Sequence, residues 1–322
     1  MNKKVFVKAG CIFFCSLFLT GCNRLGKLES PYVFSERTAL YQSGTAAGKA
    51  EPFANDLCVV SEDTPFSDGK VTAEAAAVFD IKDKEVLFAK NPFERLYPAS
   101  VTKVMTALVA LEYGDLTDEV TVTKDAVITE AGATLCGIKP GDKLTMEQLL
   151  YGLMLPSGND AGAAIAVHMA GSEEAFSRMM NEEALKLGAT GTQFVNPHGL
   201  HNQNHYTTAY DLYLIFNKAM EYPKFREIIA AKEFTASYKN EAGSPVSATW
   251  KATNWYMTGE QPMPPGLTAS GGKTGTTQAA GNCLIMGSSD SSDGEYISVV
   301  LKAAGRPGLY ENMSNILNKI VE

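Results

Sequence analysis

The spacing of apolar residues indicates a folded domain that begins near residue 73. Two β-prone runs, over 76–81 and 85–88, flank a short polar turn, as in a β-hairpin. Segments with helical periodicity follow, and capping residues, prolines or glycines mark their ends. The predicted helices span about 99–113, 149–155, 160–171, 172–188 and 208–220.

After residue 234 the apolar residues alternate in the manner of strands. Three strands are predicted over 269–277, 283–287 and 296–302. The short polar turns between them imply antiparallel pairing. Leu309, Met313 and Ile316 share one face of a final helix that can cover this sheet. We therefore expect an α/β domain of the α+β type over 71–322, in which an antiparallel sheet is flanked by helices and a helical subdomain is inserted at about 115–222.

The N-terminus has the features of an export signal. Three lysines precede an apolar run over 9–20, which is too short to span a bilayer as a helix. The run ends in Leu-Thr-Gly before Cys22, which resembles the lipobox of bacterial lipoproteins. An ordinary secretory signal that happens to contain a cysteine is the alternative. Residues 1–21 are thus predicted to be a lipoprotein signal peptide, with Cys22 as the site of lipidation.

Residues 22–70 have the composition of a tether. They are rich in Ser, Gly, Ala, Pro and charged residues, and only a short apolar patch at 57–60 interrupts them. A flexible chain of about 45 residues has an r.m.s. reach on the order of 40 Å. Two or more acyl chains anchor a protein stably, so lipid and tether would hold the folded domain at the extracytoplasmic face of the cell membrane.

Composition and charge exclude several classes of protein. The chain of 322 residues is 45% hydrophobic, which excludes disorder throughout. Its net charge is −8, and loss of residues 1–21, with three lysines and no acid, would change this to −11. A nucleic-acid partner is not expected, because phosphate binding needs a basic surface. Outside the predicted signal peptide and the predicted lipidation site, the cysteines are Cys58, Cys136 and Cys283. They permit one disulfide, and their spacing does not match a metal-binding motif.

The first candidate catalytic motif is an SxxK pattern at the start of the predicted helix 99–113. Ser100 and Lys103 lie three residues apart on one helix face, so the amine can reach the hydroxyl. A serine hydroxyl needs an adjacent base, and a helix N-terminus together with burial favours the neutral amine that such a base requires. A second SxxK, from Ser67 to Lys70, lies in a polar stretch without a helix and is attributed to chance.

Two further motifs complete a recognisable set. Ser157-Gly-Asn159 and Lys273-Thr-Gly275 follow the SxxK pattern in that order. The three motifs resemble those of the active-site serine penicillin-binding proteins and β-lactamases. Segments 97–100, 196–200 and 280–283 are similar to those of the low-molecular-mass D-alanyl-D-alanine carboxypeptidases. The resemblance covers about residues 72–322 and implies the DD-peptidase/β-lactamase-like fold.

The resemblance implies a role for each motif residue. Ser100 would be the nucleophile and Lys103 its base. Ser157 would relay a proton between Lys103 and Lys273, and Asn159 would orient Lys103 and bind the substrate amide.

Substrate contacts are implied on the strand that carries the third motif. Lys273 would lie on an edge strand and lend positive charge, while the hydroxyls of Thr274 and Thr276 would bind the substrate's terminal carboxylate. The backbone N–H groups of Thr276 and of the nucleophile would form the oxyanion hole. Gly275 is expected because substrate must pair closely with this strand. Arg306 is a second candidate contact for the carboxylate, and an ordinary exposed arginine is the alternative.

The expected activity is hydrolysis of the terminal D-Ala-D-Ala bond of peptidoglycan stem peptides through a serine acyl-enzyme, without a cofactor and with β-lactams as covalent inhibitors. A β-lactamase is one alternative, but class A enzymes need an ExxLN glutamate. The nearest match is Glu182 with Leu185, which Lys186 follows within a continuous helical pattern. A penicillin-binding sensor lipoprotein, acylated without turnover, is another alternative that the sequence leaves open.

Other catalytic constellations have weaker support. His198, His201 and His205 have a spacing that suggests zinc, but no HExxH or supporting carboxylate pattern accompanies them. A polar loop explains them better, and no metal site is predicted. The chain also lacks the GxSxG elbow of a Ser-His-Asp hydrolase.

Replacing the lipidated cysteine tests the predicted anchor. The Cys22→Ser variant should be released from membranes or remain unprocessed, because no lipid can be attached. Membrane fractionation and the mass of the mature chain would report this. A variant that stayed membrane-bound after signal cleavage would contradict the prediction.

Overall fold

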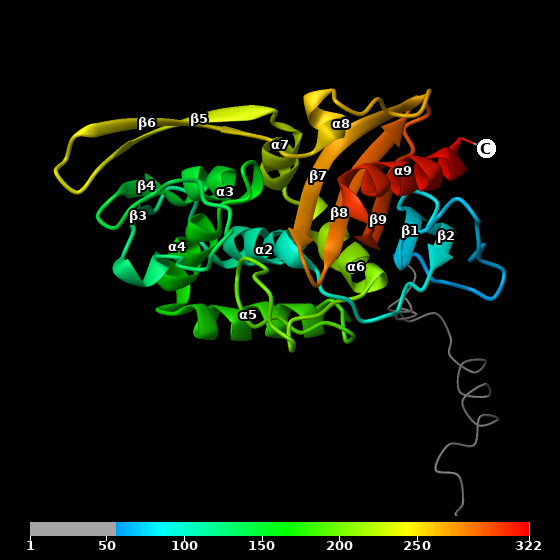
Figure 1. Ribbon diagram of the computed structural model, residues 1–322, viewed down its shortest axis with the longest axis horizontal. Coiled ribbons are helices and arrows are strands. Elements are labelled where there is room, and N and C mark those ends of the chain that lie inside the picture. Colours follow the sequence, from blue (N-terminus) through cyan, green and yellow to red (C-terminus); the bar gives the residue numbers. More distant parts are fainter. Residues whose placement is uncertain (1–55, 322) are drawn as a thin grey trace, which may run out of the picture. The chain divides into compact units, whose positions relative to one another are not determined.

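A five-stranded antiparallel sheet forms the base of the folded domain. The computed structural model describes residues 56–321 (Figure 1). The strand order is β2-β1-β9-β8-β7, so strands from both ends of the domain pair in one sheet and β7 forms an edge. The strands are β1 (Ala75–Asp80), β2 (Glu85–Lys90), β7 (Leu267–Thr277), β8 (Gly281–Asp290) and β9 (Glu295–Ala303). The predicted antiparallel sheet is confirmed.

Strand β1 is buried along its whole length because helices cover both faces of the sheet. Ala75, Ala77 and Phe79 contribute to the main core, which also contains helix residues from the middle of the chain. Ala76 and Val78 point the other way, toward α9 (Gly305–Leu317). This alternation follows from the two-residue period of a strand. The final helix therefore covers the sheet as the sequence predicted (Figure 1).

Most of the helices lie, in sequence, between β2 and β7 of this sheet, and η3 follows α9 at the C-terminal end of the described chain. The helices are η1 (Ala99–Thr102), α2 (Lys103–Tyr113), η2 (Lys124–Ala126), α3 (Met146–Met154), α4 (Asn159–Ala170), α5 (Glu173–Lys186), α6 (Ala209–Met220), α7 (Pro223–Ala230), α8 (Trp255–Thr258) and η3 (Asn318–Ile320). Predicted caps are present: Thr145 and Gln148 form a capping box, and Ser172 and Thr208 cap α5 and α6. Between residues 56 and 321, every helix is too short or too polar to cross a bilayer.

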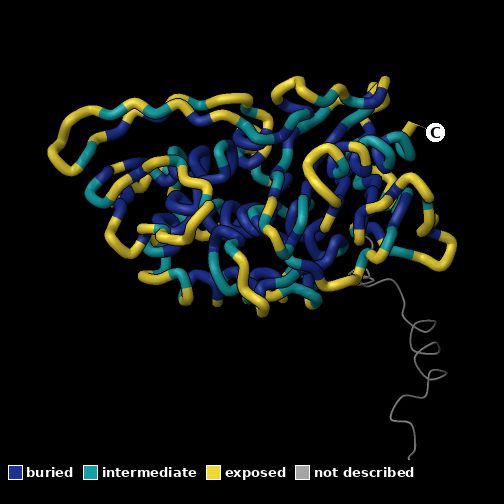
Figure 2. The backbone as a smooth tube through the Cα atoms, viewed as in Figure 1, coloured by how far each residue is buried: buried dark blue, intermediate teal, exposed yellow. Residues whose placement is uncertain are grey.

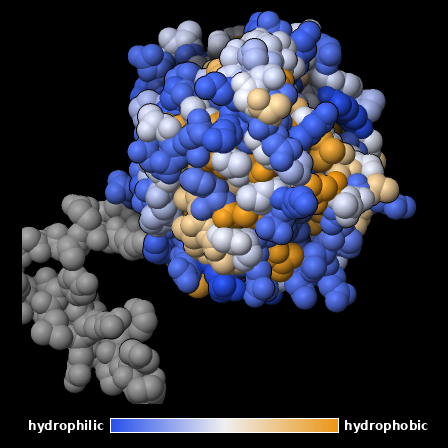
Figure 3. All heavy atoms as spheres, turned by 90° about the vertical axis from the view of Figure 1, so that its left-hand side faces the viewer, coloured by the Kyte–Doolittle hydropathy of each residue, from blue (hydrophilic) through white to orange (hydrophobic). Residues whose placement is uncertain are grey.

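A small second sheet accompanies the helices and was not resolved by the sequence analysis. Its order is β3-β4-β5-β6, with strands β3 (Glu119–Thr121), β4 (Lys143–Thr145), β5 (Glu233–Lys239) and β6 (Pro245–Lys251). Strands β5 and β6 form a long hairpin, and its tip is exposed (Figure 2). Viewed from the side of the helical region, hydrophobic residues lie among more numerous hydrophilic ones (Figure 3).

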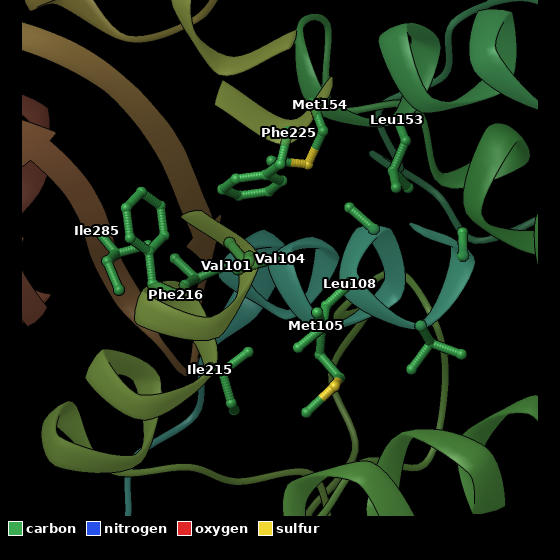
Figure 4. Close-up of a cluster of buried hydrophobic side chains, with 14 of the residues drawn as sticks. Val101, Val104, Met105, Leu108, Leu153, Met154, Ile215, Phe216, Phe225 and Ile285 are labelled. Atoms are coloured by element: carbon green, nitrogen blue, oxygen red, sulfur yellow. The ribbon is translucent and has the colours of Figure 1, made fainter. Parts of the chain in front are cut away.

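Helix α2 runs through the centre of the domain and is buried from Lys103 to Ala110. Val104 and Leu108 lie in a cluster that also includes Phe216 and Ile285, so α2 contacts both the helices and the sheet side of the core (Figure 4). A helix buried on all sides is held from every direction. This packing fixes the start of α2, where Lys103 lies directly after the η1 turn that carries Ser100.

The folded domain begins before the boundary at residue 70–71 that the sequence suggested. Cys58 is fully buried, its backbone N–H donates to the Tyr213 hydroxyl at 2.9 Å and its thiol donates to the Asp80 carbonyl at 3.2 Å. Cys58 is thus part of the core and Leu57 and Val60 pack against it, whereas Val59 is exposed, so the folded domain includes part of the segment predicted as a tether. The predicted signal peptide, the lipidated cysteine and residues 22–55 lie outside the described residues.

The three cysteines of the described chain are unpaired. Cys58 and Cys283 are buried and Cys136 is half-buried, and none forms a disulfide within residues 56–321. Burial raises the pKa of Cys283 to about 12, which makes its thiol unreactive at neutral pH.

Candidate active site

The three motifs meet where the helical region packs against the edge strand. Helix η1 with Ser100 contacts β7, which carries Lys273, and the loop before α4 carries Ser157. Two residues here have left-handed backbone angles that non-glycine residues rarely adopt, namely Ala99 with φ 48° and Ser157 with φ 69°. Such strain persists only where the surroundings impose it and is common at functional sites.

The Lys103 amine is surrounded by uncharged oxygen atoms. Its Nζ lies 3.0 Å from Ser100 Oγ, 2.6 Å from Asn159 Oδ1 and 2.7 Å from the His198 carbonyl oxygen. The two carbonyl-type oxygens can only accept hydrogen bonds. A neutral amine that donates its two N–H groups to them has its lone pair left for the Ser100 hydroxyl.

Burial favours this neutral form. Lys103 is fully buried, and desolvation, followed by the positive charge of Lys273, holds the pKa of Lys103 well below its usual range. The Asp160 carboxylate opposes this shift. Ser100 and Lys103 therefore lie in the arrangement that a nucleophile and its base require, and their catalytic roles stay a prediction.

The contacts of the second motif match the sequence expectation in part. Asn159 contacts Lys103 as expected. Ser157 is buried, but among the described residues its hydroxyl forms no hydrogen bond with either lysine. Its proposed relay between Lys103 and Lys273 therefore stays a prediction.

Lys273 lies on the edge strand β7, as expected, and its side chain is buried. Its Nζ donates to the Thr274 carbonyl at 2.9 Å. Burial, followed by the charge of Arg306, lowers the pKa of Lys273 to about 7. A substrate carboxylate placed beside this amine would raise the pKa again, because an anion favours the charged form.

The third motif also brings β7 against the nucleophile. A Cβ atom on Gly275 would lie 2.8 Å from the Ser100 backbone nitrogen and 2.9 Å from the Val101 nitrogen. The glycine is thus required by contact with η1, in addition to the substrate pairing that the sequence suggested. The Thr276 hydroxyl donates to the Asn282 side-chain oxygen at 3.0 Å, and the Thr276 side chain is exposed.

Arg306 is exposed at the start of α9 but is held in place from two sides. Its Nη2 donates to the Thr253 carbonyl at 2.6 Å, and its guanidinium lies 4.8 Å from the centre of the Trp255 ring. Its positive charge contributes to the lowered pKa of Lys273. Arg306 is therefore a constrained arginine, and its contact with the substrate carboxylate stays a prediction.

Sequence reasoning missed two groups that organise the site. One is the His198 carbonyl, which is a backbone atom and leaves no signal in residue type. The other is Asp160, whose carboxylate accepts backbone N–H groups of Cys136 and Gly137 at 2.8 Å each and thereby ties the 134–138 loop to α4. The position of Asp160 in the first turn of the helix, next to Asn159, was the available clue.

The three histidines considered for zinc do not converge on one point. His198 pairs with Glu173 at 3.3 Å, and His201 packs edge-on against Tyr97. Burial lowers the pKa of His205 to about 3, which keeps it neutral. Across residues 56–321, no group of three or more His, Cys, Asp or Glu side chains is arranged to hold a metal ion.

Comparison with known proteins gives consistent matches. The family model described as D-alanyl-D-alanine carboxypeptidase matches residues 60–305. The D-alanyl-D-alanine carboxypeptidase DacC of Escherichia coli is 36% identical over 271 residues, which cover 81% of this chain and 64% of that protein. DacF of Bacillus subtilis, with the same description, is 36% identical over 184 residues, covering 54% of this chain and 45% of that protein. The chain thus spans about half to two thirds of the length of these curated relatives.

A solved structure matches over nearly its whole length. The crystal structure of the Streptomyces K15 DD-transpeptidase has a TM-score of 0.72 and 30% sequence identity. The match covers 79% of this chain and 98% of that chain. The fold of the described domain is therefore that of DD-peptidases and penicillin-binding proteins.

Gly275→Ala should impair the site through the backbone of η1. The added methyl group would meet the Ser100 and Val101 nitrogens, so the nucleophile must shift. We expect a loss of about 1–3 kcal/mol in the free energy of unfolding and at least about tenfold slower acylation by penicillin. Gly308→Ala is the control, because a Cβ there meets nothing within 4 Å. Unchanged acylation in Gly275→Ala would contradict the close packing.

The pH dependence should reflect both lysines. Acylation should rise with pH well below the ordinary lysine pKa of about 10.4, as Lys103 loses its proton. For a substrate with a carboxylate, kcat/KM should fall as pH rises through about 7, because Lys273 of the unbound enzyme loses its charge.

Arginine variants separate the rise of activity with pH from the fall at alkaline pH, because arginine stays charged at any working pH. Lys103→Arg should not acylate, whereas Lys273→Arg should lose the alkaline fall. Stopped-flow acylation and steady-state rates across pH measure both. Comparable acylation by Lys103→Arg would exclude that lysine as the base.

Proposed function

Because this chain belongs to the D-alanyl-D-alanine carboxypeptidase family, we propose that it hydrolyses the terminal D-Ala-D-Ala bond of peptidoglycan stem peptides. The observation that carries the proposal is the buried Lys103 amine 3.0 Å from the Ser100 hydroxyl, with its pKa lowered. The matched relatives support the substrate class through their descriptions as D-alanyl-D-alanine carboxypeptidases.

Acylation transfers one proton and exchanges one bond. As Ser100 Oγ bonds to the carbonyl carbon of the penultimate D-alanine, its proton passes to Lys103 Nζ and the carbonyl electrons move to oxygen. The backbone N–H groups of Ser100 and Thr276 would stabilise this oxyanion. Its collapse breaks the C–N bond, and the departing D-alanine amine takes the proton from Lys103, directly or through Ser157.

Deacylation reverses the roles with water in place of D-alanine. Lys103 takes a proton from the water that attacks the Ser100 ester, and the Ser100 oxygen regains a proton as the ester bond breaks. Asn159 and the His198 carbonyl keep the amine oriented through both steps, because they accept its two N–H groups. No cofactor enters either step.

Recognition of the free C-terminus distinguishes a carboxypeptidase from an endopeptidase. Lys273, Thr274, Thr276 and Arg306 offer two cations and two hydroxyls near the scissile bond, and the Thr276 proton, which Asn282 accepts in this structure, would turn to the substrate. A charge-assisted hydrogen bond to a carboxylate contributes about 1.5–3 kcal/mol. We assign this cluster to the terminal carboxylate of the substrate.

A β-lactamase is less well supported. Glu182, the candidate for activating water in that reaction, is exposed on α5, and Leu185 beside it is also exposed. A penicillin-binding sensor remains the second candidate, because it would share the acylation site and differ only in the rate of deacylation.

We further propose that the enzyme acts at the extracytoplasmic face of the cell membrane, held by a lipid on Cys22. The basic and apolar order of residues 1–21 and the small residues before Cys22 support this location. Release of the Cys22→Ser variant from membranes is its test.

Mass spectrometry and D-alanine release test the activity together. Penicillin should add one covalent mass at Ser100, and Ser100→Ala should not be labelled. A peptide ending in D-Ala-D-Ala should release D-alanine steadily, whereas a sensor would give labelling without release. Amidating the terminal carboxylate should lower kcat/KM about ten- to a hundredfold. Labelling that survived Ser100→Ala would overturn the mechanism, and equal turnover of acid and amide would favour an endopeptidase.

A further inference from the structure

The carboxylate cluster depends on one residue that no motif includes. Thr253 lies between β6 and α8, and its hydroxyl oxygen is 2.7 Å from the Thr274 hydroxyl oxygen. Its carbonyl accepts the Arg306 guanidinium at 2.6 Å. Thr253 therefore touches two of the groups assigned to the substrate carboxylate, one on β7 and one on α9.

The neighbours of Thr253 hold it rigidly. The Ala252 N–H donates to the Lys232 carbonyl at 2.8 Å on one side. On the other side, Asn254 is buried and caps α8, and the Trp255 N–H donates to the Tyr310 hydroxyl at 2.8 Å. A side chain on a backbone fixed at both ends is well placed to orient another group.

The hydrogen-bond roles of the two hydroxyls follow from the ligand. A carboxylate only accepts hydrogen bonds, so the Thr274 hydroxyl must donate its single proton to the substrate. The bond between the hydroxyls then requires Thr253 to be the donor and Thr274 the acceptor. Within residues 56–321, Thr253 is the side chain that hydrogen-bonds the Thr274 hydroxyl, so its loss would leave the direction of the Thr274 proton unfixed.

We propose that Thr253 is a positioning residue for carboxylate recognition: its hydroxyl orients the Thr274 hydroxyl so that the enzyme prefers substrates with a free terminal carboxylate. The proposal rests on the proposed function. It deepens that function by naming a determinant of its specificity that lies outside the three motifs.

The test is the ratio of kcat/KM for a D-Ala-D-Ala peptide acid to that for the matched amide. Thr253→Val keeps the shape of the side chain and the carbonyl that binds Arg306, but removes the hydroxyl. The ratio should fall about three- to tenfold, the effect of one neutral hydrogen bond. Thr253→Ser should restore it, because the hydroxyl returns.

Two further variants separate positioning from general structural damage. Thr249→Val removes a similar hydroxyl pair, with Thr235 at 2.9 Å in the β5–β6 hairpin, and should leave the ratio unchanged. In a Thr274→Val background, adding Thr253→Val should lower the ratio no further, because the two hydroxyls act as one unit. Stoichiometric labelling by penicillin checks that each variant is folded.

The outcomes distinguish this proposal from the proposed function. If the unmodified enzyme turned over acid and amide equally, the assignment of the carboxylate cluster would fail. If it preferred the acid but Thr253→Val kept the full preference, the role of Thr253 would be refuted. Should Thr253→Val not fold, Thr253→Ala is judged by the same ratio, again with Thr253→Ser as the restoring variant.

Discussion

The site depends on a lysine amine that is buried without a charged partner in contact. Lys103 can be buried because neutral oxygens of Asn159, His198 and Ser100 surround it, and its neutral form avoids most of the desolvation cost of a charge. An anion beside Lys103 would favour the charged form of the amine, which has no lone pair to accept the Ser100 proton. The packing of α2 through the centre of the domain is what keeps this environment closed.

The two sides of the site come from different parts of the fold, and one contact aligns them. The nucleophile and its base belong to the buried helix, while Lys273 and its neighbours belong to the edge of the sheet. Gly275 lets the strand approach the backbone of η1, which brings the main chain of β7 close to that of Ser100. The proposed catalytic and substrate-binding groups are therefore aligned by main-chain packing, which leaves no room for a side-chain atom at Gly275.

The sequence was sufficient for the elements with strong local signals. Residue type and spacing predicted the caps at Thr145 and Ser172 and the strands of the larger sheet. The three motifs that begin at Ser100, Ser157 and Lys273 were also visible in the sequence. What it could not reveal depends on contacts between distant segments. The His198 carbonyl is backbone, and Thr253 acquires its role only when β7 and α9 come together. The apolar patch at 57–60 was visible, but the burial of Cys58 within it involves a hydrogen bond to Tyr213, far away in the chain.

A peptide substrate can pair with β7 only if this edge of the sheet is accessible. An accessible edge can also pair with a strand of another protein molecule. Natural sheets limit such self-association by pointing a charged side chain inward from an edge strand. Pairing with a second strand would then bury that charge away from water, which is unfavourable. Lys273 has that placement on β7, with its side chain buried beneath the strand. Because burial and the charge of Arg306 lower the pKa of Lys273 to about 7, this edge charge is lost as pH rises above neutrality, and the protection against edge-to-edge pairing should weaken with it.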